Sequence, residues 1–287
     1  MSSTAVLERT ADDYKSDVKP TWCPGCGDFG VLKSVYDTLV RHGRAEEDIV
    51  CVAGIGCSSR FPFFVSTYGF HGVHGRAMPI ATGVKTANPE LTVLVVGGDG
   101  DAFAIGGGHF LHAVRRNSDM TYVIMDNETY GLTKGQASPT SMLGYVTKST
   151  PKGATEAPLN PLALALACGA TYVARGFSGK PKDLTEMIVK GVEHKGLAIV
   201  DVFSPCPTFN TINTFKFFRE RTADLPKDHD PSDRAAALQY AMSEDPLYLG
   251  LLYRDPNSQS FTDRIAEKAP AVIDTNAELE SLFRRFS

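Results

Sequence analysis

Short apolar runs alternate with amphipathic stretches along most of the chain. Runs at 49–53, 92–96, 121–125, 171–174 and 197–203 predict buried strands. The run at 92–96 is continuously apolar instead of alternating, which is typical of a parallel strand covered on both faces. Periodic apolar positions predict helices at 31–42, 104–116, 161–168 and 183–194, between these strands. The order predicts an α/β fold, a parallel sheet with helices on both faces.

The chain divides into three predicted parts. Residues 1–20 are a polar arm, and 21–207 form the α/β domain. Within that domain, 21–30 is a loop rich in Gly, Pro and Cys, and 128–158 is a long loop of the kind that carries function. After 207 the alternation stops. We expect residues 208–287 to form an irregular C-terminal extension, with aromatic clusters and short helical pieces, that wraps the core or a partner.

Composition narrows the function classes. Hydrophobic residues make up 43% of the chain and charged residues 22%, as in ordinary globular proteins. The net charge of −4 and the lack of a basic run argue against a nucleic-acid binder. No apolar stretch approaches the roughly 20 residues of a membrane span, and the polar N-terminus does not resemble a secretory signal. We therefore expect a cytoplasmic protein with reduced thiols, so six cysteines require an explanation other than disulfides.

Four chemically marked residues follow predicted strands. They are Cys57, Asp99, Asn127 and Cys206. In open α/β sheets, ligands bind at the carboxyl edge of the strands. The sequence therefore predicts one site, or two adjacent sites, at this edge.

Asp99 and Asn127 suit a magnesium–diphosphate site. Mg²⁺ prefers oxygen ligands, and the carbonyl of Thr129 offers a third. Glycines at 98 and 100 let the backbone approach phosphate oxygens, and the following helix points its first amides at the anion. The alternative is that residues 98–101 form only a turn. Asn127 and the glycine-containing segment after it make this interpretation the less favoured one.

The cysteines offer four thiolates. Cys23 and Cys26 form a CxxC pair, and with Cys57 and Cys206 they supply the number that a [4Fe–4S] cluster takes. A CxxC pair alone also fits a thioredoxin-type redox pair or half of a zinc site. The scattered third and fourth ligands favour a cluster over zinc. We interpret the remaining two, Cys51 and Cys168, as core residues.

The combined motifs resemble a known family. G-D-G at 98–100 with Asn127 resembles the thiamine-diphosphate motif. The whole set resembles the β subunit of two-subunit 2-oxoacid:ferredoxin oxidoreductases, over residues 20 to 207. The matching stretches are W-C-P-G-C-G at 22–27, G-I-G-C-S at 54–58, H-G-V-H-G-R-A at 71–77, A-T-G-V-K at 81–85, G-D-G-D at 98–101, H-x-x-H-x-x-R-R-N at 109–117, D-N-x-x-Y-G-L-T-x-G-Q-x-S-P-T at 126–140 and S-P-C at 204–206.

The resemblance implies cofactors and roles for individual residues. The four cysteines would ligate a [4Fe–4S] cluster, and Asp99, Asn127 and the Thr129 carbonyl would hold Mg²⁺. A larger α subunit would complete the thiamine site in a heterodimer or a dimer of heterodimers, and ferredoxin would accept the electrons. Contacts to thiamine diphosphate would come from Ile55, Gly56, Cys57, Ser58, His74, Gly100, Asp101, Gly131 and Leu132.

Two cations are candidates for substrate recognition. Arg60 lies three residues after Cys57, and its guanidinium fork suits the second carboxylate of 2-oxoglutarate. Lys134 in the long loop is a second candidate. The predicted reaction is coenzyme A-dependent oxidative decarboxylation of 2-oxoglutarate, or its reverse. Pyruvate or a branched-chain 2-oxoacid is the alternative substrate. The residues also leave open a non-redox thiamine decarboxylase with structural zinc, and an electron-transfer or scaffold subunit without thiamine.

Overall fold

The computed structural model describes residues 9–268, 280–281 and 283–285. These residues contain one eight-stranded sheet with the strand order β2-β1-β3-β4-β6-β5-β8-β7. The first six strands in this order run parallel, whereas β8 is antiparallel to β5. The strands are β1 (Ile49–Ala53), β2 (Tyr68–His71), β3 (Thr92–Gly98), β4 (Met120–Asp126), β5 (Tyr172–Phe177), β6 (Leu197–Phe203), β7 (Thr222–Asp224) and β8 (Leu247–Arg254).

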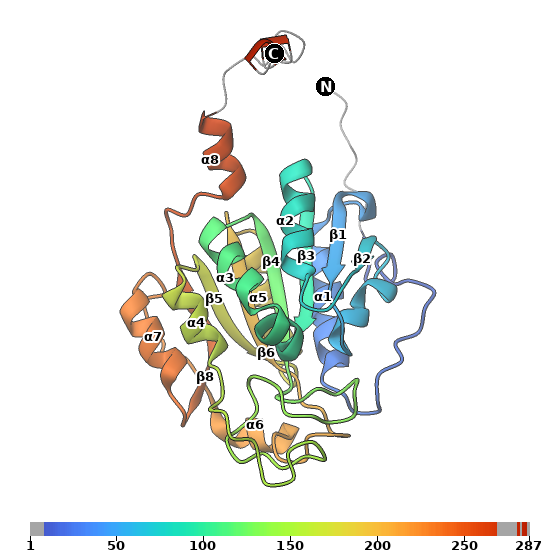
Figure 1. The fold of residues 1–287 in the computed structure, drawn as a ribbon, viewed down its shortest axis with the longest axis vertical. Coiled ribbons are helices and arrows are strands. Elements are labelled where there is room, and N and C mark those ends of the chain that lie inside the picture. Colours follow the sequence, from blue (N-terminus) through green and yellow to red (C-terminus); the bar gives the residue numbers. More distant parts are fainter. Residues whose placement is uncertain (1–8, 269–279, 282, 286–287) are drawn as a thin grey trace.

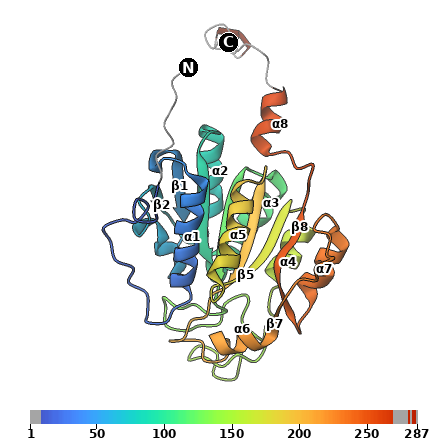
Figure 2. The same cartoon turned by 180° about the vertical axis from the view of Figure 1, so that it is seen from behind.

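Helices cover both faces of the sheet, as predicted (Figures 1 and 2). On one face, α1 (Asp28–His42) and α5 (Pro181–Val192) pack side by side against the central strands. The other face is covered by α2 (Ala77–Ala87), α3 (Gly107–Arg116), α4 (Pro161–Ala167) and α7 (Arg234–Met242). Because both faces are covered, every residue of β1, β4, β5 and β6 is buried.

Two elements in the first half of the chain were not predicted. The edge strand β2 has four exposed residues and pairs only with β1, so it lacks the apolar run that marks a buried strand. Helix α2 contains Pro79 and Gly83, which lower helix propensity. Its buried face, which includes Met78 and Ala81, is stabilised by packing on the sheet. The predicted helix at 104–116 begins as a π-helical turn, Asp101–Ile105, before α3.

The C-terminal segment adds more regular structure than the sequence pattern showed. It forms α6 (Phe215–Arg221), β7, α7, β8 and α8 (Phe261–Lys268). Strand β8 extends the sheet beside β5, and the buried Phe218 of α6 stacks on Phe203 of β6 with ring centroids 4.4 Å apart. The expected short helices are therefore present. The division of the chain at residue 207 stays a prediction.

The long loop between β4 and α4 lies below the carboxyl ends of the parallel strands (Figure 1). Helix α6 lies at the same end of the molecule. The edge that the sequence predicted for the site is thus covered by residues 128–158 and by the turn that follows β6. Among the described helices, none has the length and apolar character needed to cross a lipid bilayer.

The opposite end of the fold contains a histidine that should make stability depend on pH. His194 is 3% exposed and lies 2.8 Å from the Thr171 hydroxyl, and burial lowers its pKa to about 4. Between an unfolded pKa near 6.5 and pH 4, the unfolded chain binds a proton that the folded chain does not. Stability should therefore fall as the pH drops through this window, by roughly 3 kcal/mol in total.

Urea unfolding at pH 7.5 and pH 5 measures this effect. His194→Gln, which cannot titrate, should show a smaller loss of stability at pH 5 than the wild type. Equal losses in the two proteins would contradict the assignment.

Candidate active site

The four cysteines predicted to bind a metal centre line one cavity of about 200 Å³ at the carboxyl edge of the sheet. Two precede α1, one follows β1 and one follows β6. Gly131 packs between two of them, since a Cβ at this position would lie 3.5 Å from Cys57 Sγ and 3.6 Å from Cys206 Sγ. In the described residues, no three His, Cys, Asp or Glu side chains are close enough to share a single metal ion. The thiols instead surround a space.

Burial opposes the ionisation of three of these thiols. Removal from water raises the pKa of Cys57 to about 12 and also raises the pKa of Cys26 and Cys206. The buried carboxyl of Asp28 adds to each of these shifts. A cationic centre that binds thiolates would offset this cost.

Trp22, the only tryptophan of the chain, holds the Cys57 loop in place. Its indole N–H donates a 2.7 Å hydrogen bond to the Cys57 carbonyl. The indole ring is 8% exposed and packs against Phe29, Phe61 and Phe64. No role was predicted for Trp22 from the sequence, although it directly precedes the CxxC pair.

The magnesium candidates lie at the ends of adjacent strands, β3 and β4. Asp99 is 2% exposed and Asn127 8% exposed. The amide oxygen of Asn127 accepts a 3.1 Å hydrogen bond from the Thr129 N–H, which places Thr129 beside it. The donor set of carboxylate, amide and carbonyl oxygens fits a hard cation. Asn127 also lines the cysteine cavity, so the two predicted sites share a wall.

Thr140 joins two carboxyl groups at this edge. Its hydroxyl lies 2.8 Å from an Asp99 oxygen and 2.7 Å from an Asp126 oxygen. Because a hydroxyl has one hydrogen, it donates to only one of them, and the other carboxyl must supply the second proton. Burial raises the pKa of both carboxyls, and that of Asp126 to well above its usual value. Burial is the largest cause of both shifts, and the nearby carboxyl of Asp99 raises the pKa of Asp126 further.

Asp101 faces neighbouring loops. One carboxylate oxygen accepts hydrogen bonds from the backbone N–H of Ile55 at 2.9 Å and of Gly75 at 2.7 Å. The same oxygen lies 2.7 Å from His74 Nδ1. Asp101 is 3% exposed and so fixes the loop before Cys57 against the loop that carries His74. This arrangement favours a positioning role for Asp101 and leaves Nε2 of His74 available to a ligand.

Both substrate candidates line the cysteine cavity. Arg60 lies in the short 3₁₀ helix Ser58–Phe63 after Cys57, and Lys134 ends a tight turn closed by its N–H to the Gly131 carbonyl at 3.1 Å. Lys134 has a φ of 76°, a conformation that non-glycine residues rarely adopt and that is often found at functional sites.

The other residues predicted for this edge divide into buried and exposed groups. Ser58 is 3% exposed, and the half-exposed Leu132 lines the cavity. Tyr130 occupies the space that a side chain would take at Gly100. The two cysteines interpreted as core residues lie outside the cavity, Cys51 buried in β1 and Cys168 partly buried after α4.

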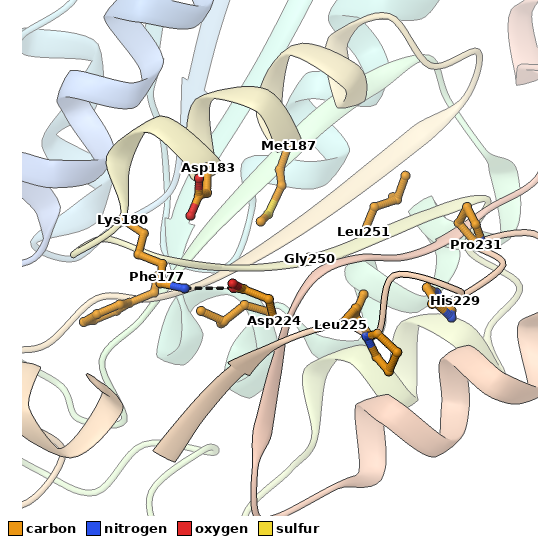
Figure 3. A pocket seen from close by; sticks show the side chains of 12 residues that line it. Phe177, Lys180, Asp183, Met187, Asp224, Leu225, His229, Pro231, Gly250 and Leu251 are labelled. Carbon is orange, nitrogen blue, oxygen red and sulfur yellow. Dashed lines mark hydrogen bonds and ion pairs between the residues drawn. The ribbon is translucent and has the colours of Figure 1, made fainter. Parts of the chain in front are cut away.

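A separate hollow of about 400 Å³ lies beside α5, between its first turns and strands β7 and β8 (Figure 3). An ion pair of 2.8 Å between Lys180 and Asp224 crosses it. None of the predicted site residues lines this hollow.

Comparison with known proteins identifies the class of protein to which this fold and the site at the carboxyl edge of its sheet belong. Residues 54–202 match the family described as thiamine pyrophosphate enzyme, C-terminal TPP binding domain. Residues 206–269 match the family described as the C terminal of the pyruvate ferredoxin oxidoreductase beta subunit. The fold is thus that of a thiamine pyrophosphate-binding domain.

Individual relatives identify the family within this class of protein. The chain is 43% identical to 2-oxoacid:ferredoxin oxidoreductase 2, subunit beta, of Aeropyrum pernix, over 93% of this chain and 90% of that protein. It is 48% identical to 2-oxoglutarate oxidoreductase subunit KorB of Mycobacterium tuberculosis, over 74% of this chain and 57% of that protein. The structure of 2-oxoglutarate:ferredoxin oxidoreductase from Magnetococcus marinus with 2-oxoglutarate, coenzyme A and succinyl-CoA bound superimposes with a TM-score of 0.91, at 46% identity and 96% coverage of both chains. The chain belongs to the β subunits of the 2-oxoacid:ferredoxin oxidoreductases, as its motifs predicted.

Proposed function

We propose that this protein is the catalytic β subunit of a 2-oxoglutarate:ferredoxin oxidoreductase. The reaction converts 2-oxoglutarate and coenzyme A to succinyl-CoA and CO₂ with reduction of ferredoxin, and it also runs in reverse. One observation carries the proposal: a single cavity is lined by the four cysteines, by the magnesium candidate Asn127 and by both substrate candidates. The similar structure that contains 2-oxoglutarate and coenzyme A supports the choice of substrate.

The metal assignments follow from the donor atoms. Cys23, Cys26, Cys57 and Cys206 would hold a [4Fe–4S] cluster, because all four line one cavity and supply the number of thiolates that such a cluster takes. Asp99, Asn127 and the Thr129 carbonyl would hold Mg²⁺ and, through it, the diphosphate of thiamine. When bound, thiamine diphosphate supplies the electron sink for decarboxylation, and the cluster supplies one-electron transfer.

The chain's own residues prepare this site. The Thr140 hydroxyl contacts a carboxyl oxygen of both Asp99 and Asp126, and Asp101 fixes the loops that carry Ile55 and His74. The other predicted cofactor contacts are Gly56, Cys57, Ser58, Gly100, Gly131 and Leu132.

A larger partner subunit fits the exposed surface beside the site. Large apolar side chains stay exposed along β2 and the neighbouring turns, with Val73 69%, Tyr68 64%, Ile105 53% and Phe70 47% exposed. Exposed apolar groups of this kind mark protein interfaces. We assign this surface to the α subunit of a heterodimer. Ferredoxin as the acceptor and a cytoplasmic location remain predictions.

Anaerobic purification of the chain with its α subunit tests the proposal. We expect a brown complex with about four irons per β chain. It should retain thiamine diphosphate in a magnesium-dependent manner and reduce ferredoxin when 2-oxoglutarate and coenzyme A are added. A colourless zinc protein would support a non-redox decarboxylase instead, and a complex without thiamine would support a scaffold subunit.

Arg60 should determine the preference for 2-oxoglutarate. Arg60→Ala removes the guanidinium from the cavity and should raise the KM for 2-oxoglutarate by about tenfold to 100-fold, since a charge-assisted pair contributes roughly 1.5–3 kcal/mol. The KM for pyruvate, which lacks the second carboxylate, should change little. Steady-state kinetics with both substrates measures the difference, and an equal response would exclude the specificity role.

A further inference from the structure

Asn210 lies in the turn after β6, four residues beyond Cys206, and is fully buried. No role was predicted for this residue from the sequence. Its backbone N–H donates a 2.9 Å hydrogen bond to the Cys206 carbonyl. Its side-chain oxygen accepts from the backbone N–H of Ile212 at 3.1 Å and of Asn213 at 3.0 Å. These contacts make Asn210 part of the turn that carries a proposed cluster ligand.

The side-chain amino group of Asn210 reaches the other half of the site. It donates a 3.1 Å hydrogen bond to the backbone carbonyl of Asn127, the magnesium candidate, and a second of 3.1 Å to Asn213 Oδ1. The side-chain amide thus uses both of its hydrogens and both acceptor positions of its oxygen. Because the group is buried, water cannot replace a lost partner, so the arrangement has little freedom.

The surrounding contacts hold the same turn but do not make this link. Tyr145 donates from its hydroxyl to the Phe209 carbonyl at 3.0 Å, which attaches the turn to the long loop. Gly131 packs between Cys57 and Cys206. In the described part of the chain, the side-chain hydrogen bond that joins the Cys206 turn directly to Asn127 is the one from Asn210.

We infer that Asn210 is a positioning residue that fixes the turn carrying Cys206 relative to the strand end carrying Asn127. It thereby sets the spacing between the cluster and the thiamine diphosphate site. This inference rests on the proposed function, because it assumes that both groups bind where their candidate ligands lie. Residues that orient metal ligands in this way typically change affinity or activity by 10-fold to 100-fold when they are replaced.

Asn210→Asp is the most informative substitution. It keeps the size of the side chain and the oxygen that receives the Ile212 and Asn213 N–H groups, but it turns the donor into an oxygen that faces two acceptors. In the α–β complex we expect a dissociation constant for thiamine diphosphate that is higher by about tenfold, and a shifted electron paramagnetic resonance spectrum of the reduced cluster. Iron content should stay at the wild-type level. Asn210→Ala, which adds no charge, replaces this variant if the aspartate protein does not fold.

Tyr145→Phe is the matched control. It removes the hydrogen bond from Tyr145 to the Phe209 carbonyl in the same turn and leaves every partner of the Asn210 side chain in place, so both readouts should remain near wild type. A wild-type complex without iron or thiamine would refute the proposed function itself. If the wild type binds both groups and the folded Asn210 variants match it in affinity and spectrum, the inference is overturned. A lower melting temperature as the only change would overturn it equally.

Discussion

Replacing Asp99 with alanine should abolish magnesium-dependent binding of thiamine diphosphate. Asp99 is a buried carboxyl at the end of β3, and the Thr140 hydroxyl lies 2.8 Å from one of its oxygens. Its loss removes the charged ligand of the proposed cation. Because even residues that only orient a metal ligand cost 10-fold to 100-fold, a direct ligand should cost at least about 100-fold in affinity. Calorimetric titration of the complex with thiamine diphosphate, at several Mg²⁺ concentrations, measures it.

Two further variants make this result specific. Asp119→Ala removes a partly buried aspartate that pairs with Lys85 at 3.3 Å, outside the cavity, and should leave cofactor affinity unchanged. Thr140→Val removes the hydroxyl between the two carboxyls and should weaken the binding of thiamine diphosphate by about tenfold. Thr140→Ser, which keeps a hydroxyl, should restore part of this affinity. Unchanged magnesium-dependent binding in Asp99→Ala would show that the cation is held elsewhere.

Cys57→Ala should eliminate the iron–sulfur cluster and, with it, ferredoxin reduction. The substitution removes one of four thiols around the cavity, while the backbone carbonyl that binds the Trp22 indole is retained. We therefore expect the loop to keep its position and the iron content to fall from about four atoms per chain to below one. Iron analysis and the visible absorption spectrum measure this, and fluorescence of Trp22 reports on the same cavity.

Cys168→Ala provides the control for Cys57. Cys168 is a partly buried cysteine at the end of α4 and does not line the cavity. Its replacement should leave iron content and ferredoxin reduction at the wild-type level. If Cys57→Ala kept both properties as well, the proposed cluster would need a different set of ligands.

The apolar runs in the sequence were enough to predict the central parallel sheet. Strands covered on both faces are largely apolar, so β3, β4 and β6 were recognisable as short apolar runs. Because such strands expose their carboxyl ends at one edge, residues that directly follow them were predicted to meet. The cysteine thiols and the oxygen ligands among these residues predicted two kinds of metal site.

The residues that support this edge of the sheet are identified by contacts between segments far apart in the sequence. Trp22 and Cys57 are 35 positions apart, Thr140 and Asp99 are 41 apart, and Asn210 and Asn127 are 83 apart. Hydrogen bonds over such separations leave no periodic pattern in the local sequence, because they depend on how loops from different strands pack together. For the same reason, the edge strand β2 and the C-terminal strand β8 escaped prediction: they are defined by their neighbours in the sheet. The meeting of the four cysteines with one magnesium candidate, Asn127, in a single cavity likewise came from the fold.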